Sequence, residues 1–272
     1  MKKNEISPNI WCLQGDMPGK IITIMAWVHG NELSWVTLLQ DLKNNLQVMR
    51  WKVYIISCAN PRAIEQNIRQ TEKNMNRSFH DIPQGSAYED IRAQELLPFL
   101  RESDVLLDIH NTLNTENSIP FLISEHANMD QYFPVDTVVS GLDALHPGGS
   151  DGYMNSIGKV GLCIESGSIY DPRGTEIARD SVLNFLRATG AIEWKPAINT
   201  NQTKYHLDTI IKAKSTNLQF VKKWLDFEQV SQCDVVAYDD GVPIFAPYDG
   251  VIVFTYEPKQ VGDEVCVFGK KI

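Results

Sequence analysis

Short apolar segments recur through the first two thirds of the chain, and each is rich in aliphatic side chains. They cover residues 21–28, 53–57, 105–109 and 161–164. An unbroken apolar run of this length, bounded by polar or turn residues, is typical of a strand that is buried on both faces. The pattern therefore predicts four buried strands.

Longer segments between these strands carry apolar residues at every third or fourth position. They cover residues 32–43, 89–101 and 175–188. This spacing places the apolar side chains on one face of a helix. Buried strands that alternate with such helices indicate an α/β fold, with a parallel or mixed sheet flanked by helices.

The pattern changes after Trp194. Residues 196–206 are polar and are expected to form a linker. Short strand-like segments then follow, separated by Asp-Gly or Gly-Asp pairs that favour turns, at residues 235–238, 242–246, 251–256 and 265–268. We therefore expect two domains, one over residues 1–195 and a small β-rich domain over residues 196–272.

Composition and charge narrow the class of partner. The chain has 272 residues with 25 Lys and Arg against 34 Asp and Glu, a net charge of −9. This balance argues against general binding to nucleic acid or to an anionic membrane, because both require a basic face. The N-terminal residues 1–10 are polar, and no apolar run approaches the roughly 20 residues of a membrane-spanning helix. We expect a cytoplasmic protein, which could form a homo-oligomer.

The five cysteines are far apart and include no CxxC pair, so the sequence encodes neither a disulfide framework nor a cysteine-rich zinc site. Candidate chemistry lies instead where the four predicted strands end. His29 and Glu32 follow the first, Asn60 follows the second, His110 the third, and Glu165 the fourth. In open α/β sheets, ligands bind at the carboxyl ends of the strands, so these side chains are expected to converge.

His29 and Glu32 form an HxxE pair that could hold one metal ion, and His110 is the best candidate for a third ligand. Imidazole nitrogen and carboxylate oxygen suit zinc, and three protein ligands leave a position free for catalysis. Manganese or cobalt could use the same ligands. Asp108 lies two residues before His110, on the same face of a strand, and could orient its imidazole. It could equally be an aspartate that only pairs at the strand end.

The segment from Asn60 to Phe79 is basic in an otherwise acidic chain. It contains Arg62, Arg69, Lys73 and Arg77. An arginine fork matches a carboxylate through two hydrogen bonds, although a charge run is more often a solvated helix face. Residues 74–77 break the helical pattern, which weakens that alternative. His146, in a glycine-rich segment, is a further candidate for a residue at the border of a site.

Five short motifs follow one another between residues 29 and 167. They are HGNE (29–32), NPRA (60–63), NRSF (76–79), DIHNT (108–112) and IESG (164–167). Together with Arg69, this series resembles the succinylglutamate desuccinylase/aspartoacylase family of the zinc carboxypeptidase-like clan. The resemblance covers roughly residues 20–190. It implies a zinc-carboxypeptidase-like (phosphorylase/hydrolase-like) mixed sheet, one Zn²⁺ per chain, and a C-terminal β-domain that narrows the substrate channel.

The resemblance also implies roles for individual residues. His29, Glu32 and His110 correspond to the zinc ligands. Glu165 corresponds to the glutamate that activates the attacking water and passes its proton to the leaving amine. Arg69 corresponds to the arginine that polarises the scissile carbonyl group.

The resemblance implies further residues for substrate binding. Asn76 and Arg77 correspond to the pair that grips a substrate carboxylate. A tyrosine from the C-terminal domain often reaches such a site, and Tyr248 and Tyr256 are both candidates. Asn155 stands ten residues before Glu165, where aspartoacylases have an arginine that holds a second substrate carboxylate.

The sequence also departs from the family pattern. Asn74 replaces the aspartate of a D-L-N-R stretch, and Gln70 stands where tyrosine is common. Because Asn155 lacks the fork of the arginine that it replaces, N-acetylaspartate and N-succinylglutamate are disfavoured as substrates. We therefore expect a small anionic N-acyl amino acid with a single carboxylate, or a related amide. The alternatives are a zinc carboxypeptidase that acts on a peptide terminus and a non-catalytic metal-containing binding protein.

Overall fold

The computed structural model describes residues 2–32, 36–112 and 118–272, and these form one large mixed sheet flanked by helices. The strand order is β1-β2-β4-β3-β5-β8-β6-β7-β9-β15-β14-β11. Neighbouring strands are parallel in the central block β4-β3-β5-β8, whereas β6 runs antiparallel to β8. The expected α/β class with a mixed sheet is confirmed.

The four predicted buried strands correspond to β3 (Met17–Ala26), β4 (Arg50–Ile56), β5 (Val105–Thr112) and β8 (Val160–Ser168). Their carboxyl ends lie at one edge of the sheet, since all four run in the same direction. The remaining strands among residues 2–195 that the structure describes are β1 (Lys2–Ser7), β2 (Ile10–Gln14), β6 (Phe121–Ser124) and β7 (Thr137–Ser140).

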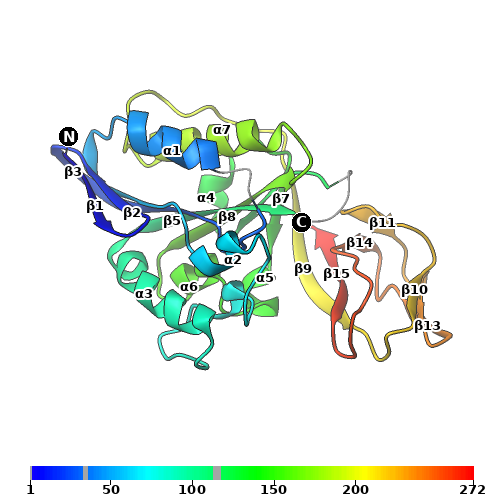
Figure 1. The fold of residues 1–272 in the computed structure, drawn as a ribbon. Helices are drawn as coiled ribbons and strands as arrows, with labels where there is room; N and C mark the ends of the chain where they lie inside the picture. Colours follow the sequence, from blue (N-terminus) through cyan, green and yellow to red (C-terminus); the bar gives the residue numbers. More distant parts are fainter. Residues whose placement is uncertain (1, 33–35, 113–117) are drawn as a thin grey trace.

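Helices cover both faces of the sheet (Figure 1). α1 and α7 lie on one face, and α3 and α6 lie on the other. An apolar cluster lies between the sheet and the helices on each face. The cluster beneath α1 and α7 includes Leu39 and Phe185, and the cluster beneath α3 and α6 includes Leu97 and Met154. The helices are α1 (Val36–Asn45), α2 (Pro61–Glu65), the 3₁₀ helix η2 (Met75–Arg77), α3 (Tyr88–Glu102), α4 (Ala127–Asp130), α5 (Leu142–Leu145), α6 (Ser150–Ser156) and α7 (Gly174–Ala188).

The predicted helices over residues 89–101 and 175–188 are confirmed as α3 and α7. The third, expected over residues 32–43, appears as α1 from Val36, and residues 33–35 lie outside the described part of the chain. Among the helices that the structure describes, none combines the length and the apolar character that crossing a bilayer requires.

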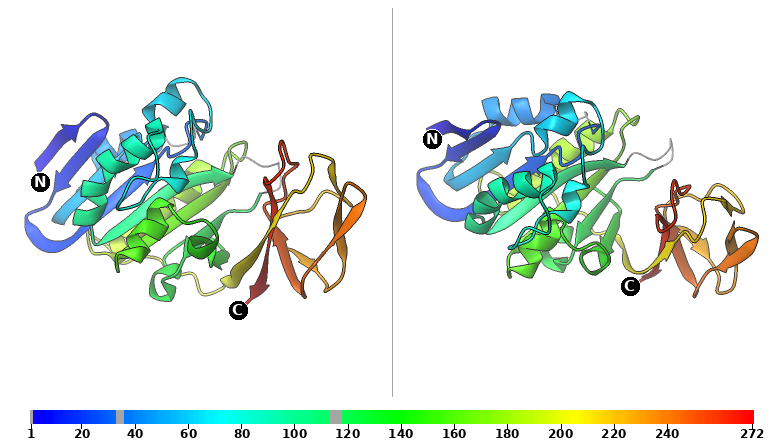
Figure 2. Two further views of the ribbon diagram at one scale, coloured as in Figure 1. Left: turned by 90° about the horizontal axis from the view of Figure 1, so that it is seen from below. Right: turned by 60° about the horizontal axis from the view of Figure 1, so that its bottom comes forward.

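The C-terminal part is rich in strands, as expected. It contains β9 (Thr203–Lys212), β10 (Leu218–Phe220), β11 (Glu228–Val230), β12 (Val235–Asp239), β13 (Val242–Phe245), β14 (Gly250–Val253) and β15 (Glu264–Lys271). It projects from one end of the α/β layers, as Figure 2 shows in two further views, and has an apolar cluster of its own around Val236 and Phe268.

The expected linker differs from the structure at its C-terminal end. Strand β9 begins at Thr203, within the polar segment, and pairs with β7 on one side and β15 on the other. These backbone hydrogen bonds explain why a polar segment is extended and ordered here. The division into residues 1–195 and 196–272 stays a prediction, because β9 joins β7 and β15 within one twelve-stranded sheet, whereas β10, β12 and β13 form a separate sheet of three strands.

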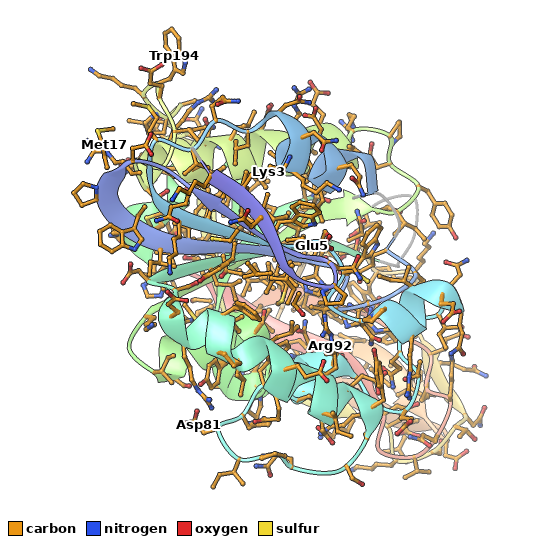
Figure 3. The ribbon with its side chains drawn as sticks, turned by 60° about the vertical axis from the view of Figure 1, so that its left-hand side comes forward. Lys3, Glu5, Met17, Asp81, Arg92 and Trp194 are labelled. Carbon is orange, nitrogen blue, oxygen red and sulfur yellow. The ribbon has the colours of Figure 1, made fainter. Side chains whose placement is uncertain are left out.

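At the other end of the sheet, β1 forms the outer edge and pairs only with β2 among the described strands (Figure 3). It carries Lys3 and Glu5, and charged side chains on an edge strand oppose pairing with other chains. Trp194, just before the predicted linker, projects from the surface in Figure 3 and is 81% exposed.

Candidate active site

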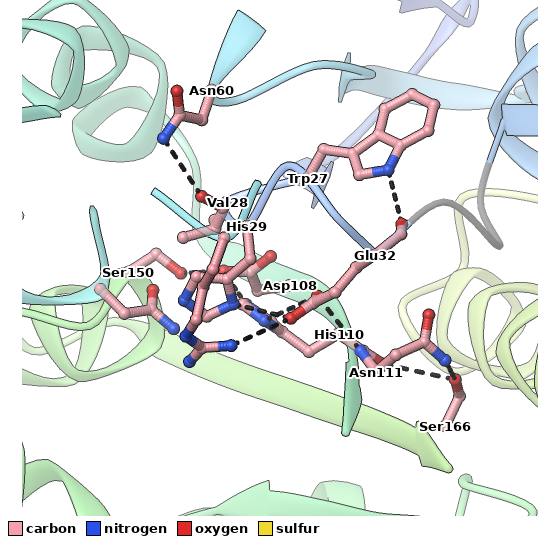
Figure 4. Close-up of polar contacts among 12 residues, drawn as sticks. Trp27, Val28, His29, Glu32, Asn60, Asp108, His110, Asn111, Ser150 and Ser166 are labelled. Atoms are coloured by element: carbon pink, nitrogen blue, oxygen red, sulfur yellow. Dashed lines mark hydrogen bonds and ion pairs between the residues drawn. The ribbon is translucent and has the colours of Figure 1, made fainter. Parts of the chain in front are cut away.

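The two histidines and the glutamate of the predicted metal site lie together at the carboxyl edge of the sheet (Figure 4). The loop after β3 supplies His29 and Glu32, and β5 supplies His110. Nδ1 of His29 is 2.7 Å from Oε1 of Glu32, and Nδ1 of His110 is 3.3 Å from Oε2. All three side chains are buried, and their potential ligand atoms lie within 4.8 Å of one another.

Local sequence explains how the HGNE segment reaches this position. A Cβ atom on Gly30 would lie only 2.0 Å from the carbonyl carbon of Ala63, so only glycine allows this close approach to α2. Asn60 caps α2, its side chain accepting from the backbone N–H of Ala63, and Pro61 opens the helix. The HGNE and NPRA motifs are therefore packed against each other.

Burial and the mutual proximity of these groups shift their pKa values in different directions. Burial, followed by the charge of Arg69, lowers the pKa of His29 to about 4. Burial opposes ionisation of Glu32 as well, but the two adjacent imidazoles outweigh it and hold the pKa of Glu32 well below its usual range. Glu32 is therefore a carboxylate at neutral pH, and two nitrogens and one charged oxygen form the donor set that zinc prefers.

Each imidazole is also contacted on its far side. Nε2 of His110 lies 3.2 Å from Oδ2 of Asp108, which accepts a 2.5 Å hydrogen bond from Ser150. Nε2 of His29 lies 3.1 Å from Oδ1 of Asn74. The structure thus places Asp108 where it can orient a ligand imidazole, the first of its two sequence interpretations.

Glu165 lies beside the three candidate ligands. It pairs with His110 across the parallel strands β8 and β5. Its Oε2 atom is buried and has no hydrogen-bond partner among the described residues. Burial, partly offset by the charge of His110, raises the pKa of Glu165 to about 7.

A cavity of about 440 Å³ opens in front of these residues. Its lining includes His29 and Glu165, together with three of the predicted substrate or catalytic residues, Arg69, Asn76 and Arg77. Tyr256 from the C-terminal part also lines it. The structure therefore brings these sequence-predicted residues into one space.

Glu89 of α3 holds the segment between Arg69 and Arg77 in place through hydrogen bonds. The buried Glu89 carboxylate accepts hydrogen bonds from the backbone of residues 71–73 and from the Thr71 hydroxyl. Arg77 donates to the carbonyl of Asn76 at 2.9 Å, and no carboxylate of the described residues lies within ion-pair distance of it. Burial lowers the pKa of Arg77. Arg69 lies 3.6 Å from Oε1 of Glu32.

Two other predicted substrate residues lie outside the cavity lining. The Asn155 amide donates to Asp143 at 2.7 Å and accepts from His126 and from the backbone N–H of Gly161. The Tyr248 hydroxyl donates to Asp208, and the ring packs in the C-terminal apolar cluster. Both side chains are engaged in holding their own surroundings together.

The structure also adds residues that the sequence did not single out. Besides Glu165, three further carboxylate side chains line the cavity: Asp143, Asp151 and Glu264. His146, which the sequence did suggest as a residue at the border of a site, lines the cavity too, and its Nε2 lies 2.5 Å from Oε2 of Glu264. The glycine-rich segment that contains His146 and Asp151 was the available signal. Burial and the charges of Asp143 and Asp108 raise the pKa of Asp151 to about 7.

The fold and the site together define a class, a mixed α/β domain with a buried His-Glu-His cluster and a neighbouring glutamate at the carboxyl ends of its parallel strands. The model of the succinylglutamate desuccinylase/aspartoacylase catalytic domain matches residues 18–188, and the chain belongs to this family.

Individual relatives share the fold and part of the sequence. The chain is 26% identical over 192 residues to an N-acyl-aromatic-L-amino acid amidohydrolase (carboxylate-forming) of Xenopus tropicalis, covering 61% of this chain and 59% of that protein. It is 32% identical over 116 residues to the N-alpha-acetyl-L-2,4-diaminobutyric acid deacetylase of Halomonas elongata, covering 41% and 33%. The crystal structure of succinylglutamate desuccinylase from Vibrio cholerae has a TM-score of 0.79 at 20% identity, covering 97% of this chain and 85% of that one.

Proposed function

We propose that this chain is a zinc-dependent hydrolase that cleaves the amide bond of an N-acyl amino acid. The observation that carries the proposal is the juxtaposition of the buried His29, Glu32 and His110 with Glu165 and two arginines around one cavity. The relatives that match in sequence include deacylases of N-acyl amino acids. Family membership supports the same reaction class.

His29, Glu32 and His110 would hold the metal through two Nδ1 atoms and the Glu32 carboxylate. Zinc, when bound, lowers the pKa of water to about 7 and polarises a carbonyl group. The fit rests on the donor set and on burial, because two imidazole nitrogens and a buried carboxylate point toward one another there and offer a cation both lone pairs and negative charge.

Glu165 acts as the general base and acid. Its unpartnered Oε2 can accept a proton from the attacking water and then donate it to the nitrogen of the departing amine. A pKa near 7 suits both steps, because the group can then hold and release a proton at neutral pH. Such proton transfer typically contributes about 10²–10⁴-fold to the rate.

Arg69 and Arg77 have different roles in this proposal. Arg69, beside Glu32, stabilises negative charge that develops on the scissile carbonyl oxygen. Arg77, whose guanidinium has no carboxylate partner among the described residues, grips the substrate carboxylate together with Asn76. Tyr256 is the tyrosine that we propose to reach the substrate, and residues 196–272 restrict the channel through Tyr256 and Glu264.

The charge of the cavity bears on the amino acid that is released. Asn155, at the position expected to contact a second carboxylate, is turned into hydrogen bonds with Asp143 and His126. Asp143, Asp151 and Glu264 line the cavity and would repel a second negative charge. We therefore propose a substrate with one carboxylate and a neutral or cationic side chain. The similarity to a deacetylase of an N-acetyl diamino acid supports this choice.

The test is a panel of zinc-loaded reactions. N-acetyl derivatives of aspartate, leucine, phenylalanine, ornithine and 2,4-diaminobutyrate are compared, with release of primary amine as the readout. The proposal expects turnover of the neutral or cationic substrates and little turnover of N-acetylaspartate. Preferential cleavage of long peptides at their carboxyl end would instead support a carboxypeptidase, and ligand retention without cleavage would support a binding protein.

A further inference from the structure

Asn74 places one oxygen atom between the candidate metal ligands and the substrate segment. Its Oδ1 lies 3.1 Å from Nε2 of His29 and accepts a 3.0 Å hydrogen bond from the backbone N–H of Asn76. The same residue caps the 3₁₀ helix η2, which carries Asn76 and Arg77. One amide oxygen is thus shared by a candidate metal ligand and the turn that presents the proposed carboxylate grip.

The contact with Asn76 determines which way the Asn74 amide points. A backbone N–H can be paired only with an acceptor, so the atom shared by Asn76 and His29 is the oxygen. Both ring nitrogens of His29 therefore face acceptor oxygens, Nε2 that of Asn74 at 3.1 Å and Nδ1 that of Glu32 at 2.7 Å. A cation held by Nδ1 and Glu32 would take the Nδ1 lone pair, and the ring proton would then be on Nε2, where Asn74 can accept it.

The two imidazoles are therefore oriented by different groups. A carboxylate, Asp108, lies behind His110, whereas a neutral amide lies behind His29. We propose that Asn74 is a positioning residue that orients the ring of His29 for metal binding, by accepting from Nε2, and that the same oxygen couples metal binding to the order of the turn at residues 75–77. This inference rests on the proposed function, because it assumes that His29 is a ligand.

The first test measures Zn²⁺ affinity of the full chain by competition with a chromophoric chelator. Loss of such an orienting contact typically weakens metal binding by about 10–100-fold, and Asn74→Ala is expected to fall in that range. Asn74→Asp keeps the shape and both contacts and is expected to bind Zn²⁺ at least as tightly as the native chain. Asn217→Ala serves as a control, since this exposed asparagine bonds to Asp240 in the C-terminal part.

The second test reads the tautomer and the coupling directly. Imidazole ¹⁵N spectra of the metal-free chain are expected to show a larger fraction of His29 protonated at Nε2 in the native chain and in Asn74→Asp than in Asn74→Ala, where only Glu32 contacts the ring and draws the proton to Nδ1. Hydrogen exchange at residues 75–79 is expected to slow when Zn²⁺ is added to the native chain, and not in Asn74→Ala.

Zn²⁺ affinity of Asn74→Ala within threefold of the native value, with an unchanged tautomer, would overturn the inference and leave the proposed function intact. If Asn74→Ala fails to fold, Asn74→Asp decides the question. The inference is overturned if Asn74→Asp binds Zn²⁺ more than tenfold more weakly than the native chain does, or if His29 of Asn74→Asp loses its Nε2 proton. A native chain that binds no Zn²⁺ would contradict the proposed function itself.

Discussion

Replacing Arg77 tests how the cavity recognises a carboxylate. Arg77 makes one hydrogen bond, to the carbonyl of Asn76, and no ion pair with the described residues, so its remaining N–H groups can meet a ligand. Hydrogen bonds to a charged group contribute about 1.5–3 kcal/mol each. Removing a two-bond contact in Arg77→Met should therefore cost about 3–4 kcal/mol, or roughly 10²–10³-fold in kcat/KM.

The assay compares each N-acyl amino acid with its primary amide, which keeps the shape and loses the negative charge. The native chain should prefer the acid strongly, and Arg77→Met should lose that preference while cleaving the amide about as well as the native chain does. Arg77→Lys should fall between the two, because it keeps the charge but loses the fork. Arg173→Met is a control, since Arg173 is exposed and pairs with Asp171.

The double-mutant logic isolates the contact between Arg77 and the carboxylate from any general disturbance of the site. Equal losses for the acid and for the amide in Arg77→Met would refute the assignment of Arg77 as the carboxylate partner. That outcome would leave Arg69 as the alternative partner within the same cavity.

Three further expectations follow from the site. Asp151→Asn should improve kcat/KM for N-acetylaspartate relative to N-acetylornithine. The gain in melting temperature of this variant over the native chain should also grow as the pH rises from about 4 to about 7, because in that range Asp151 ionises readily in the unfolded chain whereas burial keeps it protonated in the folded one. An unchanged substrate ratio, or a melting-temperature difference that does not vary with pH, would contradict this account. Tyr256→Phe should alter kcat or KM, whereas Tyr248→Phe should leave both within about twofold, since only Tyr256 lines the cavity; steady-state kinetics of the pair decides it. A chelator should lower the melting temperature, and Zn²⁺ in excess should restore it. Free Zn²⁺ at a hundredfold excess over its Kd should add about 2.7 kcal/mol to the free energy of unfolding. Identical melting curves with and without Zn²⁺ would speak against a metal site.

The central strands and the site that they carry could be predicted from the sequence for a physical reason. A strand buried on both faces has an apolar run, as in residues 21–28, and the polar residues that follow such a run in a parallel sheet share one edge. The convergence of His29, Glu32, His110 and Glu165 could therefore be predicted from their positions after the strands, whereas their roles stay a proposal that the family resemblance suggested.

Other features depend on contacts that a sequence does not display. The hairpin of β1 and β2 was not predicted, because β1 (Lys2–Ser7) is mostly exposed and lacks an apolar pattern. Strand β9 begins inside a polar segment, and its order comes from pairing with β7 and β15. The first and last residues of β9 could therefore not be predicted from the composition of this segment.

The direction in which a side chain points could not be predicted from the sequence either. Asn155 was singled out by its spacing from Glu165, yet its amide is satisfied by Asp143 and His126. Tyr248 precedes strand β14 and Tyr256 follows it, and only the folded chain shows that Tyr256, unlike Tyr248, lines the cavity. Asp151 and Glu264 come together from distant segments, α6 and β15, so no local pattern could associate them.

The most direct test of the proposed function compares amine release by the zinc-loaded native chain with release by zinc-loaded Glu165→Gln, on the best substrate of the N-acyl panel. Metal content is measured on the same samples. The account predicts that both proteins hold one Zn²⁺ per chain and that the variant loses about 10²–10⁴-fold in kcat. Near-native turnover by Glu165→Gln, with its metal in place, would contradict the account.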